Sequence, residues 1–171
     1  NQMLANQWTD KANIHCFNVA ANLADCWKDQ FNREKRHFEK GLEIANRAIA
    51  FREQLNKGDN SKSMAYWVKG KHLMSLGRYE ESEAAFTSAL NYDLSAANLS
   101  GDFDAPSSES TFGVVVNFGF VGLAKVRLGK GEGQSQFDKA VEIFQDWLED
   151  ETKKGDAEVG LMELEESARL N

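Results

Sequence analysis

The clearest pattern of hydrophobic and polar positions lies between residues 61 and 94. Tyr66, Gly70 and Leu73 are spaced by three and four residues, which places them on one face of a helix. A second stripe with this spacing follows Gly77, a residue type that often ends a helix in the left-handed conformation. The pattern predicts two antiparallel helices with a tight turn at Gly77. We expect the small Gly70 to lie where they cross and to face the second stripe, formed by Tyr79, Ser82, Phe86, Ala89 and Leu90.

Residues 112 to 150 carry a second pattern of the same kind. Its first stripe ends at Leu128-Gly129, and its second stripe follows a longer, Gly-rich turn at 130–135. The apolar run 114–116 has the composition of a strand, but the helical spacing continues through it, so we expect a buried helix there. The two stripes are formed by Phe118, Val121 and Gly122 and by Phe137, Ala140, Phe144 and Leu148.

Residues 10 to 56 and the two remaining segments complete the expected organisation. A weaker pair of stripes, with a connection around 29–36, consists of Phe17, Ala20, Ala21 and Ala24 and of Phe38, Gly41, Ala45 and Ala48. The segment 95–111 is rich in Ser, Asn, Asp and Gly, contains Pro106, and predicts a long connecting loop. The tail from 156 to 170 has a helical pattern. We expect Val159, Met162 and Ala168 to contact the rest of the chain, and the acidic run 163–166 to face solvent.

The best-formed unit resembles a tetratricopeptide repeat (TPR), a helical hairpin of about 34 residues that stacks with copies of itself. The resemblance covers residues 61–94 most fully, 112–150 less so and 10–56 least. Lys69 and Leu94 depart from it, since the family usually has Leu and Pro at these positions. It implies an all-α fold, a short α-solenoid in one domain of residues 1–171. Three irregular hairpins would be followed by a C-terminal helix that caps the array with a polar face.

The resemblance also implies where a partner binds. In this family one face of each first helix lines a concave groove that takes an extended peptide or a partner helix. Trp and Met are residue types typical of recognition surfaces. We therefore expect a protein or peptide partner, anchored on Trp67. The alternative uses are core packing, a small-molecule pocket, and self-association of a structural homo-oligomer such as a homodimer. The groove positions are Met64, Trp67, Lys71 and Met74 in one unit and Val116, Leu123 and Arg127 in the other.

Composition and charge narrow the function classes. The net charge of −7 argues against binding to a phosphate backbone, so no nucleic-acid partner is expected. No run of 18 apolar residues occurs, so no membrane association is expected. The chain starts at Asn1, so an upstream segment could have been removed. Cys16 and Cys26 are too few and, on one helix, too far apart for a disulfide. Two thiols fit a reducing compartment, and we expect a cytoplasmic protein.

Candidate chemistry is sparse in this sequence. His15, His37 and His72 lack a second ligand at zinc-like spacing. No nucleophile elbow and no phosphate-binding loop motif occur. We therefore expect no enzymatic activity, no metal and no cofactor, and the sequence favours a protein–protein interaction module.

Overall fold

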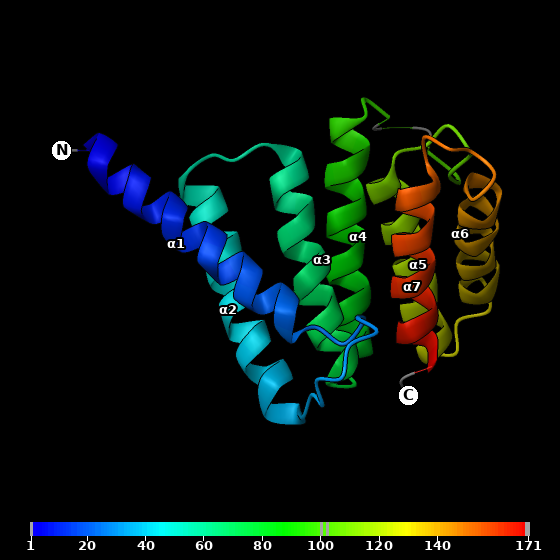
Figure 1. The fold of residues 1–171 in the computed structure, drawn as a ribbon, viewed down its shortest axis with the longest axis horizontal. Coiled ribbons are helices and arrows are strands. Elements are labelled where there is room, and N and C mark those ends of the chain that lie inside the picture. Colours follow the sequence, from blue (N-terminus) through cyan, green and yellow to red (C-terminus); the bar gives the residue numbers. More distant parts are fainter. Residues whose placement is uncertain (1, 100, 102, 170–171) are drawn as a thin grey trace.

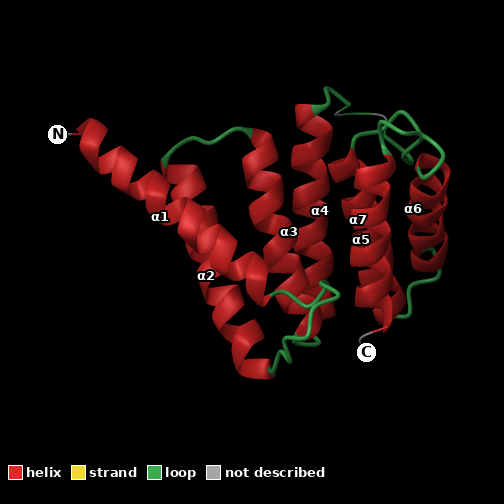
Figure 2. Ribbon diagram, viewed as in Figure 1, coloured by secondary structure: helices red, strands yellow, loops and turns green. Residues whose placement is uncertain are grey.

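The computed structural model describes residues 2–99, 101 and 103–169. Within this part of the chain every regular element is a helix (Figure 2), which confirms the predicted all-α fold class. The helices are α1 (Gln2–Leu23), α2 (Lys35–Gln54), α3 (Asp59–Ser75), α4 (Tyr79–Ala96), α5 (Phe112–Arg127), α6 (Gly133–Trp147) and α7 (Lys154–Arg169).

The helices follow one another side by side in chain order (Figure 1). Three antiparallel pairs, α1–α2, α3–α4 and α5–α6, are followed by α7, which contacts both α6 and α5. Contacts also join α1 to α3 and α3 to α5, so the first helices of successive pairs are neighbours. The N-terminal half of α1 projects beyond the body of the molecule (Figure 1).

The helices lie close to the positions that the hydrophobic pattern predicts. The run 114–116 belongs to α5, so the helical interpretation is confirmed and the strand alternative is wrong. α1 begins at Gln2, well before the expected start near residue 10. The last helix begins at Lys154 instead of 156, and the predicted end at residue 170 lies outside the described residues.

The crossing of α3 and α4 is built as the sequence indicates. A Cβ atom on Gly70 would lie 2.7 Å from the Phe86 ring, so only glycine allows this approach. The hydroxyl of Ser82 donates a hydrogen bond to the Gly70 carbonyl at 2.9 Å. Gly77 has φ of 71°, the left-handed conformation expected at the end of α3. The predicted contacts of this hairpin are therefore confirmed.

A single apolar cluster joins α3 to α7. Phe86 of α4 and Phe120 of α5 stack with ring centroids 4.7 Å apart. Phe144 of α6 packs edge-on against Trp147 and reaches α7 at Gly160, where a Cβ atom would lie 2.4 Å from its ring. Burial of these aromatic side chains stabilises the fold, because each large apolar side chain removed from water contributes about 1.5–3 kcal/mol.

The segment between α4 and α5 packs on a second apolar cluster, formed by Leu90, Leu94, Val114 and Phe118, and reaches the first cluster at Trp147. Its described residues form neither helix nor strand, so the predicted loop is confirmed from residue 97, while residues 95 and 96 belong to α4. Phe103 packs edge-on against Phe118 of α5. The carbonyl of Ser108 accepts hydrogen bonds from the Trp147 indole at 2.9 Å and from Lys153 at 2.5 Å. The loop is therefore attached to α5, α6 and the start of α7.

The orientation of α7 differs from the expected polar cap. Glu163, Leu164 and Glu166 are buried, and Glu165 alone in this run is exposed, so the expectation that 163–166 is a solvated face is wrong. Val159, expected to be a contact, is 40 % exposed. The cause is that α7 turns its acidic residues toward Lys71 and the α1–α2 connection. Local periodicity does not show this.

Gly70→Ala is expected to destabilise the fold by about 1–3 kcal/mol, because the added methyl group must displace the Phe86 ring. The matched control is Gly155→Ala in the first turn of α7, where no atom lies within 4 Å of an added Cβ. The control should be neutral or stabilising, since alanine favours helix more than glycine. Urea denaturation of both variants measures the difference. Equal effects would contradict the close crossing of α3 and α4.

Candidate functional site

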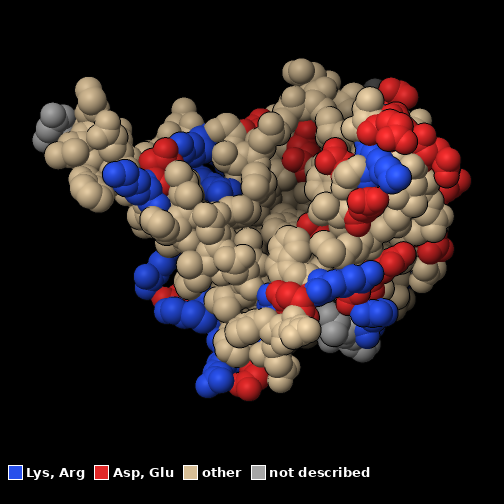
Figure 3. All heavy atoms as spheres, in the orientation of Figure 1, with Lys and Arg blue, Asp and Glu red and all other residues tan. Residues whose placement is uncertain are grey.

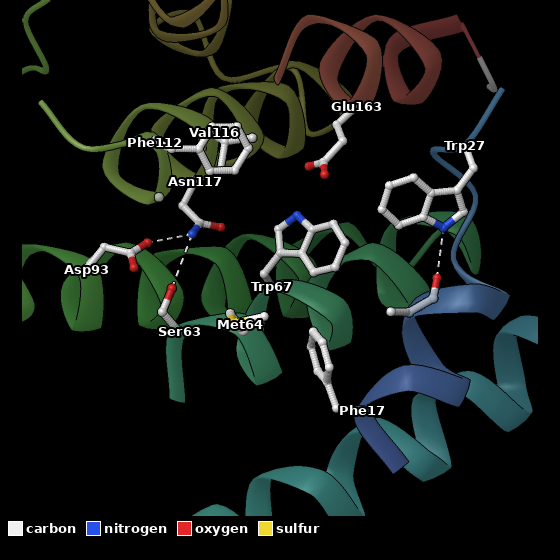
Figure 4. Close-up of a pocket in the computed structure, with 12 residues that line it drawn as sticks. Phe17, Trp27, Ser63, Met64, Trp67, Asp93, Phe112, Val116, Asn117 and Glu163 are labelled. Atoms are coloured by element: carbon white, nitrogen blue, oxygen red, sulfur yellow. Dashed lines mark hydrogen bonds between the residues drawn. The ribbon is translucent and has the colours of Figure 1, made fainter. Parts of the chain in front are cut away.

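The first helices of the hairpins enclose a cavity of about 320 Å³. We call it the central cavity (Figure 4). Residues of α1, α3, α5 and α7 contribute to its wall, together with Asp93 of α4 and Trp27 of the α1–α2 connection. Its apolar wall includes Phe17, Trp27, Met64, Trp67, Phe112 and Val116, and its polar wall is formed by Ser63, Asp93, Asn117 and Glu163.

The aromatic part of the wall is held in place by its own contacts. Trp27 and Trp67 pack edge to face with centroids 6.3 Å apart. The Trp27 indole nitrogen donates to the carbonyl of Ala21 at 2.9 Å, which fixes the ring against α1 (Figure 4). The guanidinium of Arg52 lies 4.6 Å from the Phe17 ring centroid. The cavity is thus a preformed feature with oriented rings.

A hydrogen-bonded polar group forms one side of the cavity. The Asn117 amide donates to the Asp93 carboxylate at 2.8 Å and to the Ser63 hydroxyl at 3.4 Å (Figure 4). Asp93 reaches this position because Gly113 has no side chain, and a Cβ there would lie 2.7 Å from the carboxylate. Burial raises the pKa of Asp93, and hydrogen bonds from Ser63 and Asn117 oppose the shift. The side-chain oxygen of Asn117 is buried and accepts no hydrogen bond from the described residues.

Glu163 of α7 lies on another side of the cavity and is 5 % exposed. Burial raises the pKa of its carboxyl to about 7, against the attraction of Lys71 and of the Trp67 indole. In Figure 4 the indole nitrogen of Trp67 is directed toward this carboxylate. By distance and angle neither that nitrogen nor Glu163 Oε2 completes a hydrogen bond within the described part of the chain, although the indole lies near enough to Glu163 to lower the pKa of its carboxyl. Both are buried polar atoms beside an open space, which a bound group can satisfy.

Lys71 lies behind the Glu163 side of the wall and is 1 % exposed. Its ammonium donates to the Ser167 hydroxyl and, at 3.5 Å, to the Asp25 carbonyl. It also lies 4.7 Å from the Phe120 ring centroid. Burial lowers the pKa of Lys71, and the neighbouring Glu163 and Asp25 oppose the shift. This ammonium therefore connects α3 to α7 and to the connection after α1.

The predicted groove residues divide into three groups. Met64, Trp67 and Val116 line the central cavity, and Met64 remains 48 % exposed at its edge. Lys71, Met74 and Leu123 are at most 3 % exposed, so the expectation that they face an open groove is wrong. Arg127 donates to the carbonyl of Ala168 at 2.8 Å, close to the C-terminal end of α7. The physical reason is that α7 packs against α5, while its Ser167 accepts a hydrogen bond from Lys71 of α3.

Several cavity residues were not predicted as site residues. Phe17 was assigned to helix packing and Glu163 to a solvated face. Trp27 and Asp93 reach the cavity from the α1–α2 connection and from a second helix, where the groove pattern predicts nothing. Asn117 could have been predicted from the sequence, because it is the one polar residue in the run 113–124. A polar residue inside a buried helix usually has a hydrogen-bonding role.

The other predicted chemistry can be compared with the described residues. Within them, no group of three or more His, Cys, Asp or Glu side chains is arranged to hold a metal ion. No described helix combines the length and the apolar composition that crossing a membrane requires. Cys16 and Cys26 are both free thiols. The imidazole of His72 is buried and hydrogen-bonds the Ala20 carbonyl at 2.9 Å, and burial lowers its pKa to about 4.

Glu163→Gln, which has the shape of the protonated side chain, is expected to remove a pH-dependent loss of stability. A carboxyl with a pKa near 7 in the folded protein and 4.5 as its ordinary value binds its proton more tightly when folded. The stabilisation that comes from this tighter proton binding is complete below pH 4.5 and is lost as the pH rises through 7. Between about pH 5 and pH 8, the wild-type free energy of unfolding should fall by about 2–3 kcal/mol relative to the variant. Urea denaturation at both pH values measures this difference.

The wild type is compared with a variant because His72 changes the free energy of unfolding with pH in the opposite direction. Because the pKa of His72 is lowered on folding, the neutral imidazole contributes stability that is complete above pH 6.5. That contribution is lost as the pH falls toward 4. It is common to both proteins and cancels in the difference. The matched control is Glu165→Gln on the exposed side of α7, which should follow the wild type. Parallel pH profiles for wild type and Glu163→Gln would contradict the raised pKa.

Comparison of the chain with models of protein families, with curated proteins and with solved structures finds no match in any of the three.

Proposed function

We propose that this chain is a TPR-like protein–protein interaction module that binds an extended peptide on the side formed by α1, α3 and α5. One side chain of the peptide enters the central cavity. The observation that carries the proposal is the set of buried, unsatisfied polar atoms around that cavity. Trp67 Nε1, Glu163 Oε2 and Asn117 Oδ1 have lost contact with bulk water and complete no hydrogen bond among the described residues, although Trp67 Nε1 faces the Glu163 carboxylate closely enough to lower its pKa. A bound group that pairs with them recovers the cost of their burial.

The size and surroundings of the cavity favour a peptide over a free small molecule. A volume of about 320 Å³ is at the lower end of the range for small-molecule sites and holds about one large side chain. Met64 is half exposed at the cavity edge, where a peptide backbone can continue along the surface. The face shown in Figure 3 is hollowed near its middle, between the α1–α3 side and the α5–α7 side.

The arrangement of the helices supports the TPR-like interpretation. Antiparallel pairs in chain order, with the first helices of successive pairs in contact, are what a stacked array of hairpins requires. The wall of the cavity comes mainly from these first helices, as expected for a concave binding side. A binding role needs no catalytic group, and we propose none. Both cysteines are free thiols, which fits the cytoplasm.

Self-association is the second candidate function, and an observation on α1 favours it. Its outer face carries large apolar side chains that no described element covers. Exposed apolar groups of this kind, collected on one helix, are typical of an interface. A second copy of the chain would cover them, unlike the originally expected self-association through the groove. These side chains are Leu4, Trp8, Ile14 and Val19, each at least 45 % exposed.

Trp67→Ala is expected to weaken peptide binding by at least about tenfold, because it removes the central ring of the cavity wall. Peptides are first selected from a random display library on the wild-type protein, and their affinities for each variant are then measured by fluorescence anisotropy. Trp8→Ala is the matched control, since Trp8 is 63 % exposed and lies on the outer face of α1. Its affinity should equal that of the wild type.

Circular dichroism confirms that both variants keep the same helicity. Failure to select any peptide, or equal affinities for wild type and Trp67→Ala, would refute peptide binding at the central cavity.

The second candidate predicts that the wild-type protein sediments as a dimer and that Leu4→Glu with Trp8→Glu converts it to a monomer. Two charges on the outer face of α1 must be desolvated in such an interface, whereas both positions are exposed in a single chain. Sedimentation velocity over a range of concentrations measures the change. A wild-type protein that stays monomeric at the highest concentration rules this candidate out.

A further inference from the structure

We propose that the central cavity selects a side chain with an apolar stem and a positively charged end, a lysine or an arginine of the bound peptide. This inference rests on the proposed function and specifies the class of residue that enters the cavity. It is argued from the polar atoms of the wall, the balance of charge, and the aromatic rings.

The unsatisfied atoms of the wall are mostly hydrogen-bond acceptors. Glu163 Oε2 and Asn117 Oδ1 are buried acceptors that complete no hydrogen bond in the described part of the chain, and the donor that faces Glu163 is the Trp67 indole. The Asp93 carboxylate lines the same cavity, and its donors among the described residues are Asn117 and Ser63 of its own polar group. Trp67 Nε1 is the one unsatisfied donor among the described cavity residues, and it is directed toward Glu163. A ligand rich in donors and poor in acceptors therefore complements this wall.

The charge balance also calls for a cation. Two carboxyl groups, Glu163 and Asp93, line the cavity, while its described lining residues include no lysine or arginine. Lys71 approaches Glu163 from behind the wall, but its ammonium is committed to Ser167 and to the Asp25 carbonyl. It is also buried against Phe120. A second positive charge inside the cavity would restore neutrality to the buried group.

The aromatic wall suits the stem and the charged end of such a side chain. Trp27 and Trp67 present ring surfaces to the same space as the two carboxyl groups (Figure 4). Aromatic faces attract ammonium and guanidinium groups and also pack against methylene stems. A metal ion would find no comparable stabilisation from these rings. The combination of rings and carboxylates distinguishes an organic cation from a neutral apolar side chain.

The surface around the cavity would assist the approach of a basic peptide. The chain carries a net charge of −7. Acidic side chains gather over the α6 and α7 side of the face in Figure 3, and basic ones lie mainly over α1 and α2. Exposed residues of this acidic region include Glu149, Asp150, Glu151, Asp156 and Glu158. Their field attracts positively charged segments at low ionic strength.

Three capped amino acids test the inference by NMR. The probes are the N-acetyl, N′-methylamide derivatives of lysine, arginine and norleucine, which share a stem but differ in end charge. The lysine and arginine probes should shift the Trp67 indole signal saturably, at least about tenfold more tightly than norleucine. The indole signals are assigned from single Trp→Phe variants at the four tryptophans.

Glu163→Gln should reduce the advantage of lysine over norleucine by about tenfold, because it removes a charge and keeps the shape. Glu165→Gln, exposed on the same helix, should leave the advantage unchanged. Since both variants preserve side-chain volume, an unaltered spectrum outside the cavity shows that the fold is intact.

The outcomes separate this inference from the proposed function. Equal binding of norleucine and lysine overturns the preference for a cation but leaves peptide binding in place. If no probe binds but display-selected peptides still bind, and their affinity still falls in Trp67→Ala, the preference for a cation is likewise overturned and peptide binding is retained. If neither probes nor peptides bind, both proposals fail. An advantage of lysine that survives Glu163→Gln overturns the role of the buried carboxylate.

Discussion

The arrangement of the molecule depends on the burial of one ammonium group. Lys71 lies near the C-terminal end of α3, where an open array of hairpins would leave it exposed. Its hydrogen bonds to Ser167 and to the Asp25 carbonyl instead bring α7 and the α1–α2 connection onto the same face of α3. A buried ammonium without partners would be very costly, so these segments must stay together or the lysine must lose its proton. This constraint reduces the expected open groove to the central cavity.

The same constraint explains the unusual state of Glu163. The carboxyl is held close to Lys71 by α7, yet burial outweighs this attraction and its pKa is raised to about 7. One buried cation therefore faces a carboxyl that changes charge near neutral pH, while Asp93 lies across the cavity. Buried ion pairs of this kind add little net stability, because desolvation offsets their attraction. Their presence beside an aromatic cavity is consistent with the proposed role of the cavity in recognition.

The sequence predicted the parts of this structure that depend on neighbours along the chain. Gly70 opposite Phe86, the turn at Gly77 and the helical nature of 114–116 all follow from local spacing. The burial of Lys71 and Glu163 does not, because it depends on contacts between residues far apart, such as the pair Lys71 and Ser167 separated by 96 positions. Glutamate-rich helices usually face solvent, and nothing local marks Glu163 and Glu166 as exceptions.

For the candidate site, the sequence located part of one wall and missed the others. Met64, Trp67 and Val116 lie on first helices, where the TPR resemblance predicts the binding residues. Trp27 and Asp93 come from a connection and from a second helix, and their positions follow only from tertiary packing. Asp93, for example, reaches the cavity because Gly113 on the next hairpin has no side chain. A pattern that describes one helix at a time cannot predict such contacts between residues of different helices.

The long separation between Lys71 and its partner in α7 also bears on the order of folding. The hairpins are local structures, and each can form as soon as its two helices have left the ribosome. The partner of Lys71 is synthesised 96 residues later, so this lysine must stay hydrated or neutral until the last helix docks. Contacts of such high sequence separation close slowly. Completion of the cavity therefore requires the docking of the last helix, and a nascent chain can form its hairpins before the cavity is complete.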